Sequence, residues 1–297
     1  MKNYILTVFF FVFSSALYSQ YNKNLVFFDS QMNIINPAYA GYQGDTSFSL
    51  ISRNQWLSVD DAPKNSIFSF SSARENNVGL GASIFSKNTF VDKLNEFNID
   101  FSYKLKLSEK TNLFFGLKGV LEFFKSDPSF LSNDTNYNDP ALSSISIFSP
   151  NFGLGFLLNS EKYWFSLSLP KLFQTEINNI YSFDSSVITY IGTGIKIPLN
   201  DSLVMKPTIL YRDIKDLKSI FDLSYLINFK NIIDFGVTYR TNGSLIFLTK
   251  LSVKGFDFGY GFETFRNNSI GGLNLNTHEF FINFSLNKKN TEIEPAE

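Results

Sequence analysis

Residues 97–107 read FNIDFSYKLKL, and this stretch decides the fold class. Every odd-numbered position in it is apolar or aromatic, and every even-numbered position is polar or charged. Because successive side chains of a β-strand point to opposite faces, this period of two predicts a strand with one apolar and one polar face. Residues 221–229, FDLSYLINF, repeat the pattern with Leu226 as the one exception.

The same alternation divides the chain into fourteen segments. They span residues 44–53, 64–73, 77–86, 96–108, 111–125, 150–159, 162–170, 186–199, 201–212, 218–229, 231–240, 244–254, 255–265 and 277–287. The stretch from 44 to 286 therefore gives about 17 residues for each strand with its connection. A membrane strand needs about 9–11 residues, so this spacing leaves room for a turn or loop after each one.

The connections between these segments alternate in length. We number each connection by the segment that it follows. The even-numbered connections are short, at residues 108–110, 159–161, 200–201, 230–231 and 254–255. The odd-numbered ones are mostly long, at 54–63, 87–95, 126–149, 171–185 and 266–276, with only 241–243 brief. Outer-membrane barrels have an even number of strands, short periplasmic turns and longer outer loops.

These patterns predict an all-β fold, a transmembrane antiparallel β-barrel of about 14 strands in the outer membrane, because lipid admits backbone only as helices or closed barrels. The alternative is a large secreted β-sandwich or soluble barrel with its core on one face. The outer face weighs against it, since Phe, Tyr, Ile, Leu and Val occupy that face in strand after strand. Near the bilayer midplane we expect Phe101→Arg to cost roughly 2–4 kcal/mol and Ser102→Arg far less.

Composition excludes several other classes of protein. The chain has 297 residues, of which 26 are Lys or Arg and 27 are Asp or Glu, so it lacks the basic excess of a nucleic-acid binder. Charged residues make up only 18%, against about 25% in a typical soluble domain. With no Cys and a single His, neither a metal site nor a cofactor is expected.

The first residues have the pattern of a secretory signal. Lys2 supplies the positive charge, residues 5–13 (ILTVFFFVF) are apolar apart from Thr7, and small residues follow at 14–16. We expect a signal peptide over residues 1–19, with cleavage after Ser19 or, alternatively, after Ala16. A membrane anchor is the other interpretation, although a spanning helix needs about 20 apolar residues. Residues 20–43 then precede the barrel at 44–287, and 288–297 form a polar tail.

Several short stretches resemble one known family. They are NPAYAG at 36–41, RNQW at 53–56 with Ala-Pro at 62–63, NVGLG at 77–81, GVTYR at 236–240, GYGFE at 259–263 and THE at 277–279. Together they resemble the PorP/SprF family of outer-membrane proteins of the type IX secretion and gliding machinery of Bacteroidetes-type bacteria. Glu263 stands where the family more often has Asp, and Thr277 where it more often has Ser.

The resemblance implies a function that no periodicity reveals. It implies an outer-membrane component that assists the export and surface attachment of large proteins with a type IX C-terminal signal, such as adhesins. It also implies partners among the type IX components at the outer membrane and the periplasmic face. The alternative function is an outer-membrane porin or hydrophobic-solute channel, and an enzyme is not expected.

Two stretches are candidate partner-binding sites. The first, 36–41, is interpreted mainly as a turn before the first strand, because Pro37 fixes φ, with a periplasmic contact or a plug in the barrel mouth as alternatives. The second comprises residues 53–56 and 62–63. It belongs to a connection of the long kind after the first strand and is therefore expected on the outer side of the membrane, where Trp56 is either a partner anchor or a ring at the lipid boundary. The candidate residues are Asn36, Pro37, Tyr39, Gly41, Arg53, Trp56 and Pro63.

The polar face of the strands should line the lumen, and it carries acids and bases in similar numbers. The inward charged residues are Asp100, Lys104, Lys106, Lys118, Glu122, Lys206, Arg212, Asp222, Asp234, Arg240, Asp257, Glu263 and Glu279. A selective diffusion pore would favour one sign, whereas mixed signs suit a network of ion pairs. We therefore expect a largely closed interior. His278 shares a face with Phe280 and has no GxSxG nucleophile motif to serve, so a structural role is expected for it.

Overall fold

A computed structural model describes residues 24–128, 143–174, 187–214, 218–265, 269–270, 273–274 and 276–286. The expected signal peptide, the polar tail and the central parts of the two longest connections lie outside these ranges. Over the ranges described, no helix combines the length and the apolar character that crossing a membrane requires.

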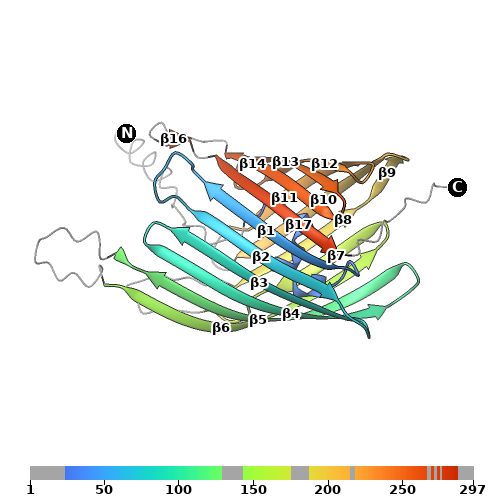
Figure 1. The fold of residues 1–297 in the computed structure, drawn as a ribbon, viewed down its shortest axis with the longest axis horizontal. Coiled ribbons are helices and arrows are strands. Elements are labelled where there is room, and N and C mark those ends of the chain that lie inside the picture. Colours follow the sequence, from blue (N-terminus) through green and yellow to red (C-terminus); the bar gives the residue numbers. More distant parts are fainter. Residues whose placement is uncertain are drawn as a thin grey trace, which may run out of the picture.

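Antiparallel strands form the wall of a closed barrel (Figure 1). Its strands are β1 (Thr46–Gln55), β2 (Lys64–Ala73), β3 (Val78–Thr89), β4 (Asp92–Lys106), β5 (Thr111–Ser126), β6 (Ile145–Ser160), β7 (Tyr163–Leu169), β8 (Ile188–Ile195), β9 (Ile197–Asn200), β10 (Leu203–Ile214), β11 (Ile220–Phe229), β12 (Ile233–Arg240), β13 (Ser244–Val253), β14 (Phe256–Phe265) and β17 (Thr277–Leu286). β17 pairs with both β14 and β1, which closes the ring. Because β8 and β9 together form one position of the wall, the prediction of about 14 strands is confirmed.

The strand that was expected over 186–199 is interrupted. It forms β8 and the four-residue β9, which both pair with β10, and Lys196 between them belongs to neither. Pro198 has no N–H for the ladder, and the register with β10 shifts between Leu203 and Val204. A short hairpin, β15 (Ser269–Ile270) and β16 (Leu273–Asn274), lies within the connection expected at 266–276.

One connection that was predicted to be long is short. The connection expected at 87–95 is only the turn Phe90–Val91, because β3 runs on to Thr89 and β4 begins at Asp92. The polar outward residues there, such as Asn88, Lys93 and Asn95, do not continue the apolar alternation, so both strands were predicted to be too short at this end. The same reason applies to β6, which begins at Ile145 and not at 150.

The two faces of the wall differ as the alternation predicts. Phe101 is 43% exposed on the outer face, whereas its neighbour Ser102 is 1% exposed on the inner face. Large apolar side chains of this kind remain exposed around the outside, among them Phe68, Ile99, Phe152, Tyr225, Phe258 and Phe280. A continuous apolar outer surface is what a lipid-facing barrel requires.

Candidate functional site: a plug inside the barrel

The chain N-terminal to β1 lies inside the barrel. Residues 24–44, which we call the plug, form three short 3₁₀ turns, η1 (Phe28–Ser30), η2 (Met32–Ile34) and η3 (Pro37–Tyr39). Leu25, Phe27 and Ile34 are almost completely buried, and a hydrophobic cluster joins the plug to inward side chains of the wall. The plug runs from the end of the barrel with the long connections, the long-loop end, to the opposite short-turn end, where β1 begins.

Glycines in the wall make room for the second half of the plug. A Cβ at Gly79 of β3 would collide with the carbonyl oxygen of Ala40. A Cβ at Gly116 of β5 would collide with the backbone of Pro37 and Ala38. These positions therefore need glycine because the plug backbone approaches the wall closely. The NPAYAG and NVGLG stretches, which are distant in sequence, are thus parts of one contact.

Asn36 is fully buried at the centre of this contact. Its Oδ1 accepts a hydrogen bond of 2.9 Å from the backbone N–H of Ala38, which caps the turn η3. Its Nδ2 donates to the Phe156 carbonyl of β6 at 3.0 Å and to the Ser166 hydroxyl of β7 at 2.8 Å. One amide side chain therefore ties the plug to two strands.

Serine side chains of the wall complete the attachment of this half. The Ser102 hydroxyl donates to the Ala40 carbonyl at 2.6 Å, and the Ser168 hydroxyl donates to the Ile35 carbonyl at 2.8 Å. The Lys118 amine donates to the Asn33 carbonyl at 3.3 Å and forms an ion pair of 2.7 Å with Asp100. Apart from Lys118, the contacts named between wall and plug here are neutral hydrogen bonds.

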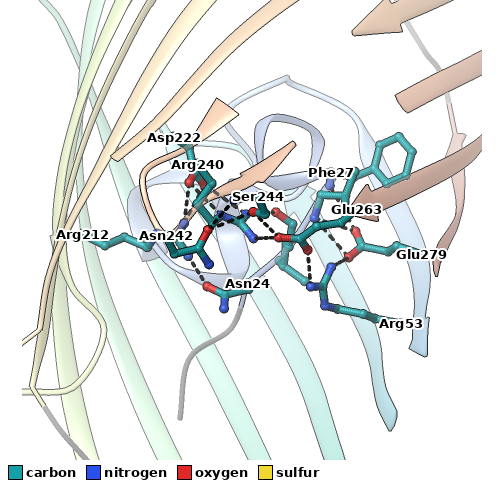
Figure 2. Close-up of polar contacts among 12 residues, drawn as sticks. Asn24, Phe27, Arg53, Arg212, Asp222, Arg240, Asn242, Ser244, Glu263 and Glu279 are labelled. Atoms are coloured by element: carbon teal, nitrogen blue, oxygen red, sulfur yellow. Dashed lines mark hydrogen bonds and ion pairs between the residues drawn. The ribbon is translucent and has the colours of Figure 1, made fainter. Parts of the chain in front are cut away.

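The first half of the plug meets a different surface, which we call the ion-pair cluster (Figure 2). It consists of three arginines and three acids from six strands, each at most 2% exposed: Arg53, Arg212, Asp222, Arg240, Glu263 and Glu279. Each lies near the end of its strand at the long-loop end. The formal charges of the cluster cancel.

The cluster is continuous around one side of the lumen. Arg53 pairs with Glu279 at 3.2 Å and with Glu263 at 2.5 Å. Glu263 also accepts from Arg240 at 2.7 Å. Arg240 and Arg212 both pair with Asp222, at 2.8 Å and 2.6 Å. Every member therefore touches at least one partner of opposite charge, as a group in a low-dielectric interior requires.

Glu279 connects the cluster to the plug. Its carboxylate accepts hydrogen bonds from the backbone N–H groups of Val26 at 3.0 Å and Phe27 at 3.1 Å. Figure 2 shows Glu279 beside Phe27. Arg240 donates to the Leu25 carbonyl at 3.2 Å, and Arg212 donates to the Asn24 side chain. Four consecutive residues of the plug are thus held by charged groups that are themselves paired. Charge-assisted hydrogen bonds of this kind are about twice as strong as neutral ones.

A second segment also enters the lumen from the wall. β6 has 16 residues and pairs with β5 along its whole length, whereas β7 has only 7 and pairs with β6 from Leu154 to Asn159. Beyond Leu169, residues 170–174 turn inward, and Lys171 pairs with Glu96 at 3.1 Å and with Glu122. Burial would lower the pKa of Lys171, but the two carboxylates outweigh it and raise that pKa above the usual range, so the amine stays charged.

Asn151 of β6 holds the same segment in place. Its Oδ1 accepts the N–H groups of Leu172 at 3.0 Å and Phe173 at 3.1 Å, and its Nδ2 donates to the Phe173 carbonyl. The Leu172 N–H also donates to the Phe152 carbonyl at 2.8 Å, on the side of β6 where β7 is missing. The segment therefore replaces strand hydrogen bonds that β7 is too short to supply.

A polar cavity of about 260 Å³ lies between the plug and the short-turn end. Asp29, Tyr42, Lys196, Lys206 and Asp257 are among the residues that line it. Its lining contains acidic and basic side chains together.

A comparison with protein-family models decides the family. The model described as "Type IX secretion system membrane protein PorP/SprF" matches residues 14–284, which include the plug and all of the barrel except the last two residues of β17. The chain belongs to the PorP/SprF family. It is therefore a type IX secretion membrane protein of the outer membrane. A search of curated proteins finds no match.

Solved structures show where the PorP/SprF barrel stands among known folds. The Pseudomonas putida toluene transporter TodX has a TM-score of 0.50 at 10% identity, over 85% of this chain and 92% of that one. The Ralstonia pickettii toluene transporter TbuX has a TM-score of 0.52 at 12% identity, over 84% and 91%. The CymD monoaromatic hydrocarbon channel has a TM-score of 0.50 at 12% identity, over 86% and 91%. At these identities the likeness establishes the outer-membrane barrel fold alone.

The structure places the candidate residues of this PorP/SprF protein in two groups. Asn36, Pro37, Tyr39 and Gly41 belong to the plug, so the stretch does contain the expected turn, η3, but that turn is packed inside the lumen. Gly41 has φ +66°, and its N–H donates to the Ser71 hydroxyl at 2.8 Å. Of the interpretations given for residues 36–41, which were a turn, a periplasmic contact and a plug in the barrel mouth, the plug matches where this stretch lies.

Arg53 was predicted to lie outside, and this was wrong. It lies in β1, points into the lumen and joins the ion-pair cluster. Arg53 is the last residue of the strand expected at 44–53, but it was grouped with the connection that follows, whereas β1 continues to Gln55. Trp56 does follow the strand, with φ +51° and its N–H bonded to the Asn276 carbonyl at 2.9 Å. Pro63 is buried, and its carbonyl accepts the Gln55 N–H at 3.0 Å.

All the charged residues that were predicted to face inward lie on the inner face, although not all in one network. Asp234 pairs with Lys250 at 2.8 Å, and Asp257 accepts from Ser252 at 2.5 Å and from Asn283 at 3.1 Å. Lys104 and Lys206 are only half-buried. Lys106 is exposed because β4 reaches beyond the plug at the short-turn end.

Ser102 shows what the alternation could not reveal. From the alternation alone, Arg at this position was expected to cost far less than Arg at position 101. Ser102 is 1% exposed and bonded to the plug, so Arg there would clash with Ala40. His278 lies on the outer face, half-exposed, with its Nδ1 2.8 Å from the Tyr260 hydroxyl.

Lys171 and Asn151 were missed as site residues. Lys171 lies in a segment without periodicity, and nothing in its sequence shows that it turns inward. Asn151 occupies an ordinary polar position of an expected strand. A signal existed for Glu96, since it continues the polar face of the strand expected at 96–108.

Proposed function

We propose that this PorP/SprF protein is a plugged outer-membrane adaptor that assists type IX export by binding, and that its lumen is not a route for solutes. It would bind secreted cargo with a type IX C-terminal signal, such as an adhesin, and type IX components at the outer membrane and the periplasmic face. No enzymatic step is part of this proposal.

One observation carries the proposal: the plug is attached around the lumen. Residues 24–44 contact β1 to β7 and also β10, β12, β14 and β17. Many of these contacts involve buried polar groups, which lose free energy if they are left unpaired. A lumen filled in this way supports an adaptor more than a pore, and the family supports the connection with type IX secretion.

Deletion of the gene tests the role in export. Proteomics of the culture medium and the cell surface should show loss of proteins with the type IX C-terminal signal, and the wild-type gene should restore them. An affinity-tagged barrel should capture the same proteins together with periplasmic components. Normal secretion in the deletion strain would contradict the proposal.

The second candidate function is a porin or a channel for apolar solutes. Solved structures with a similar fold include two toluene transporters and a monoaromatic hydrocarbon channel. Planar-bilayer conductance and liposome swelling separate the two candidates. We expect wild-type protein to conduct far less than a general porin, and porin-like conductance would favour the channel.

A further inference from the structure

The outer surface of β4, β5 and β6 carries a groove at the long-loop end. The groove has a volume of about 330 Å³. Its lining residues are Lys93, Asn95, Phe123, Phe124, Lys125, Ser146, Ile147 and Phe148. It lies where the apolar outer belt of these strands gives way to polar residues, which is the level of the lipid headgroups in the outer leaflet.

Two lysines stand side by side in this groove. Lys93 of β4 is directly opposite Lys125 of β5, and both are exposed on the outer face. Lys125 pairs with Asp127 at 3.1 Å, whereas Lys93 forms no ion pair with any residue in the described ranges. Like charges directly opposite on neighbouring strands repel each other, so an anion between them would stabilise the pair.

A third amine continues the row. Lys93 is also opposite Asn88 of β3, and Asn88 is opposite Lys64 of β2. On the other side of the barrel, the outward residues near the same end of β10 are Tyr211 and Asp213, which bond to each other at 3.2 Å. Within the described residues, three of the four outward positions in this row across β2 to β5 are therefore lysines, and the fourth is Asn88.

Aromatic rings lie directly below the lysines. Phe123 is the next outward residue after Lys125, and it is opposite Phe148, with 4.9 Å between the ring centroids. Phe97 packs edge-on against Phe123 at 5.9 Å. Phe148 is 57% exposed, so the rings present a wide apolar surface to the bilayer. The groove thus combines amines above with apolar rings below.

This arrangement suits a ligand whose anionic group sits next to its acyl chains. We propose that the groove binds the phosphate group of a glycolipid in the outer leaflet, with Lys93 and Lys125 as the phosphate ligands. Phe97, Phe123 and Phe148 contact the acyl chains below it. Lysine binds phosphate as a point charge, and juxtamembrane lysines recognise anionic lipids in this way.

Binding of defined lipids to the purified full-length barrel in detergent, measured by native mass spectrometry, tests the proposal. The probes are monophosphoryl lipid A, its dephosphorylated counterpart and phosphatidylglycerol. Wild-type protein should prefer the phosphorylated glycolipid over the dephosphorylated one by roughly tenfold or more, the scale of two lysine contacts. Equal binding of the two glycolipids would overturn the proposal, and equally tight binding of phosphatidylglycerol would overturn the assignment to a glycolipid.

Paired variants place the site. The double variant Lys93→Gln and Lys125→Gln should lose most of this preference, and Lys93→Arg with Lys125→Arg should keep it. The matched control is Lys230→Gln with Lys254→Gln, which removes the same charge from exposed turns at the short-turn end. Correct folding of each variant is checked by gel electrophoresis, in which an unheated folded barrel migrates differently from the same protein after heating. A Gln variant that folds and still binds like wild type would overturn the proposal.

Discussion

The two halves of the plug are held by contacts of different kinds. Residues 24–27 meet the ion-pair cluster, in which Arg53, Arg240 and Glu279 are completely or almost completely buried. Residues 33–41 are set against glycines and bonded mainly through neutral groups such as Asn36 and Ser168. Buried charges need all their partners at once, whereas close packing depends on shape. We therefore expect the first half to respond to charge and the second to volume.

Glu279→Ala should have the largest effect. It leaves the Val26 and Phe27 N–H groups without their acceptor and removes one partner of the buried Arg53, which should cost about 3–5 kcal/mol. Urea unfolding in lipid vesicles, followed by tryptophan fluorescence, measures the loss. Limited proteolysis should cut residues 24–27 first. Glu279→Gln keeps an acceptor of similar shape and should lose less, so equal losses in the two variants would contradict the role of charge.

Gly116→Val should come next, at about 1–3 kcal/mol, because the new side chain would overlap the plug at Pro37 and Ala38. Cleavage should now occur in residues 36–41 and spare the first half. Gly119 is a matched control in the same strand, since a Cβ there meets nothing within 4 Å. If Gly119→Val disturbs the plug as much as Gly116→Val, the close approach is not what holds this half.

Asn36→Ala should cost a similar or slightly smaller amount, about 1–3 kcal/mol, because it leaves the buried Ala38 N–H without its acceptor and removes the amide that donates to the Ser166 hydroxyl. The same unfolding measurement applies. This loss should be nearly independent of salt, whereas that of Glu279→Ala should vary with ionic strength once residues 24–27 detach. Equal salt dependence in both variants would remove the distinction between the halves.

Ser168→Ala should have the smallest effect, about 1 kcal/mol, since it removes one neutral hydrogen bond to the Ile35 carbonyl. Combined with Glu279→Ala, it tests whether the halves act independently. Because separate sites usually add within about 0.5 kcal/mol, the double variant should show the sum of the two single losses. A large departure from additivity would mean that the plug is released as one unit.

The wall could be predicted from the sequence, but the contents of the lumen could not. Alternation in stretches such as 97–107 assigns each side chain to a face, because a strand has only two faces. That assignment holds for Phe101 and Ser102, but alternation does not show what an inward side chain contacts. Inside the lumen the Ser102 side chain contacts Ala40 of the plug, a segment whose sequence does not alternate.

The cluster illustrates the same limit. Arg240, Glu263 and Glu279 were expected on the inner face from their strand positions, and the structure places them there. Arg53 was placed outside because it was grouped with the connection after the strand expected at 44–53, although it is the last residue of that strand and β1 continues to Gln55. Lys171 gave no periodic signal at all, since it acts from a connection that turns inward.

The sequence alone determined most of the strands, the alternation of their faces, most of the short and long connections and the family, because each depends on residues close together in the chain. Only the tertiary structure decided that residues 24–44 fill the barrel, that Arg53 meets Glu279 and that Gly116 touches Ala38. The reason is physical. Closing the sheet brings residues more than 200 positions apart into one lumen, and which of them meet depends on register and strand tilt.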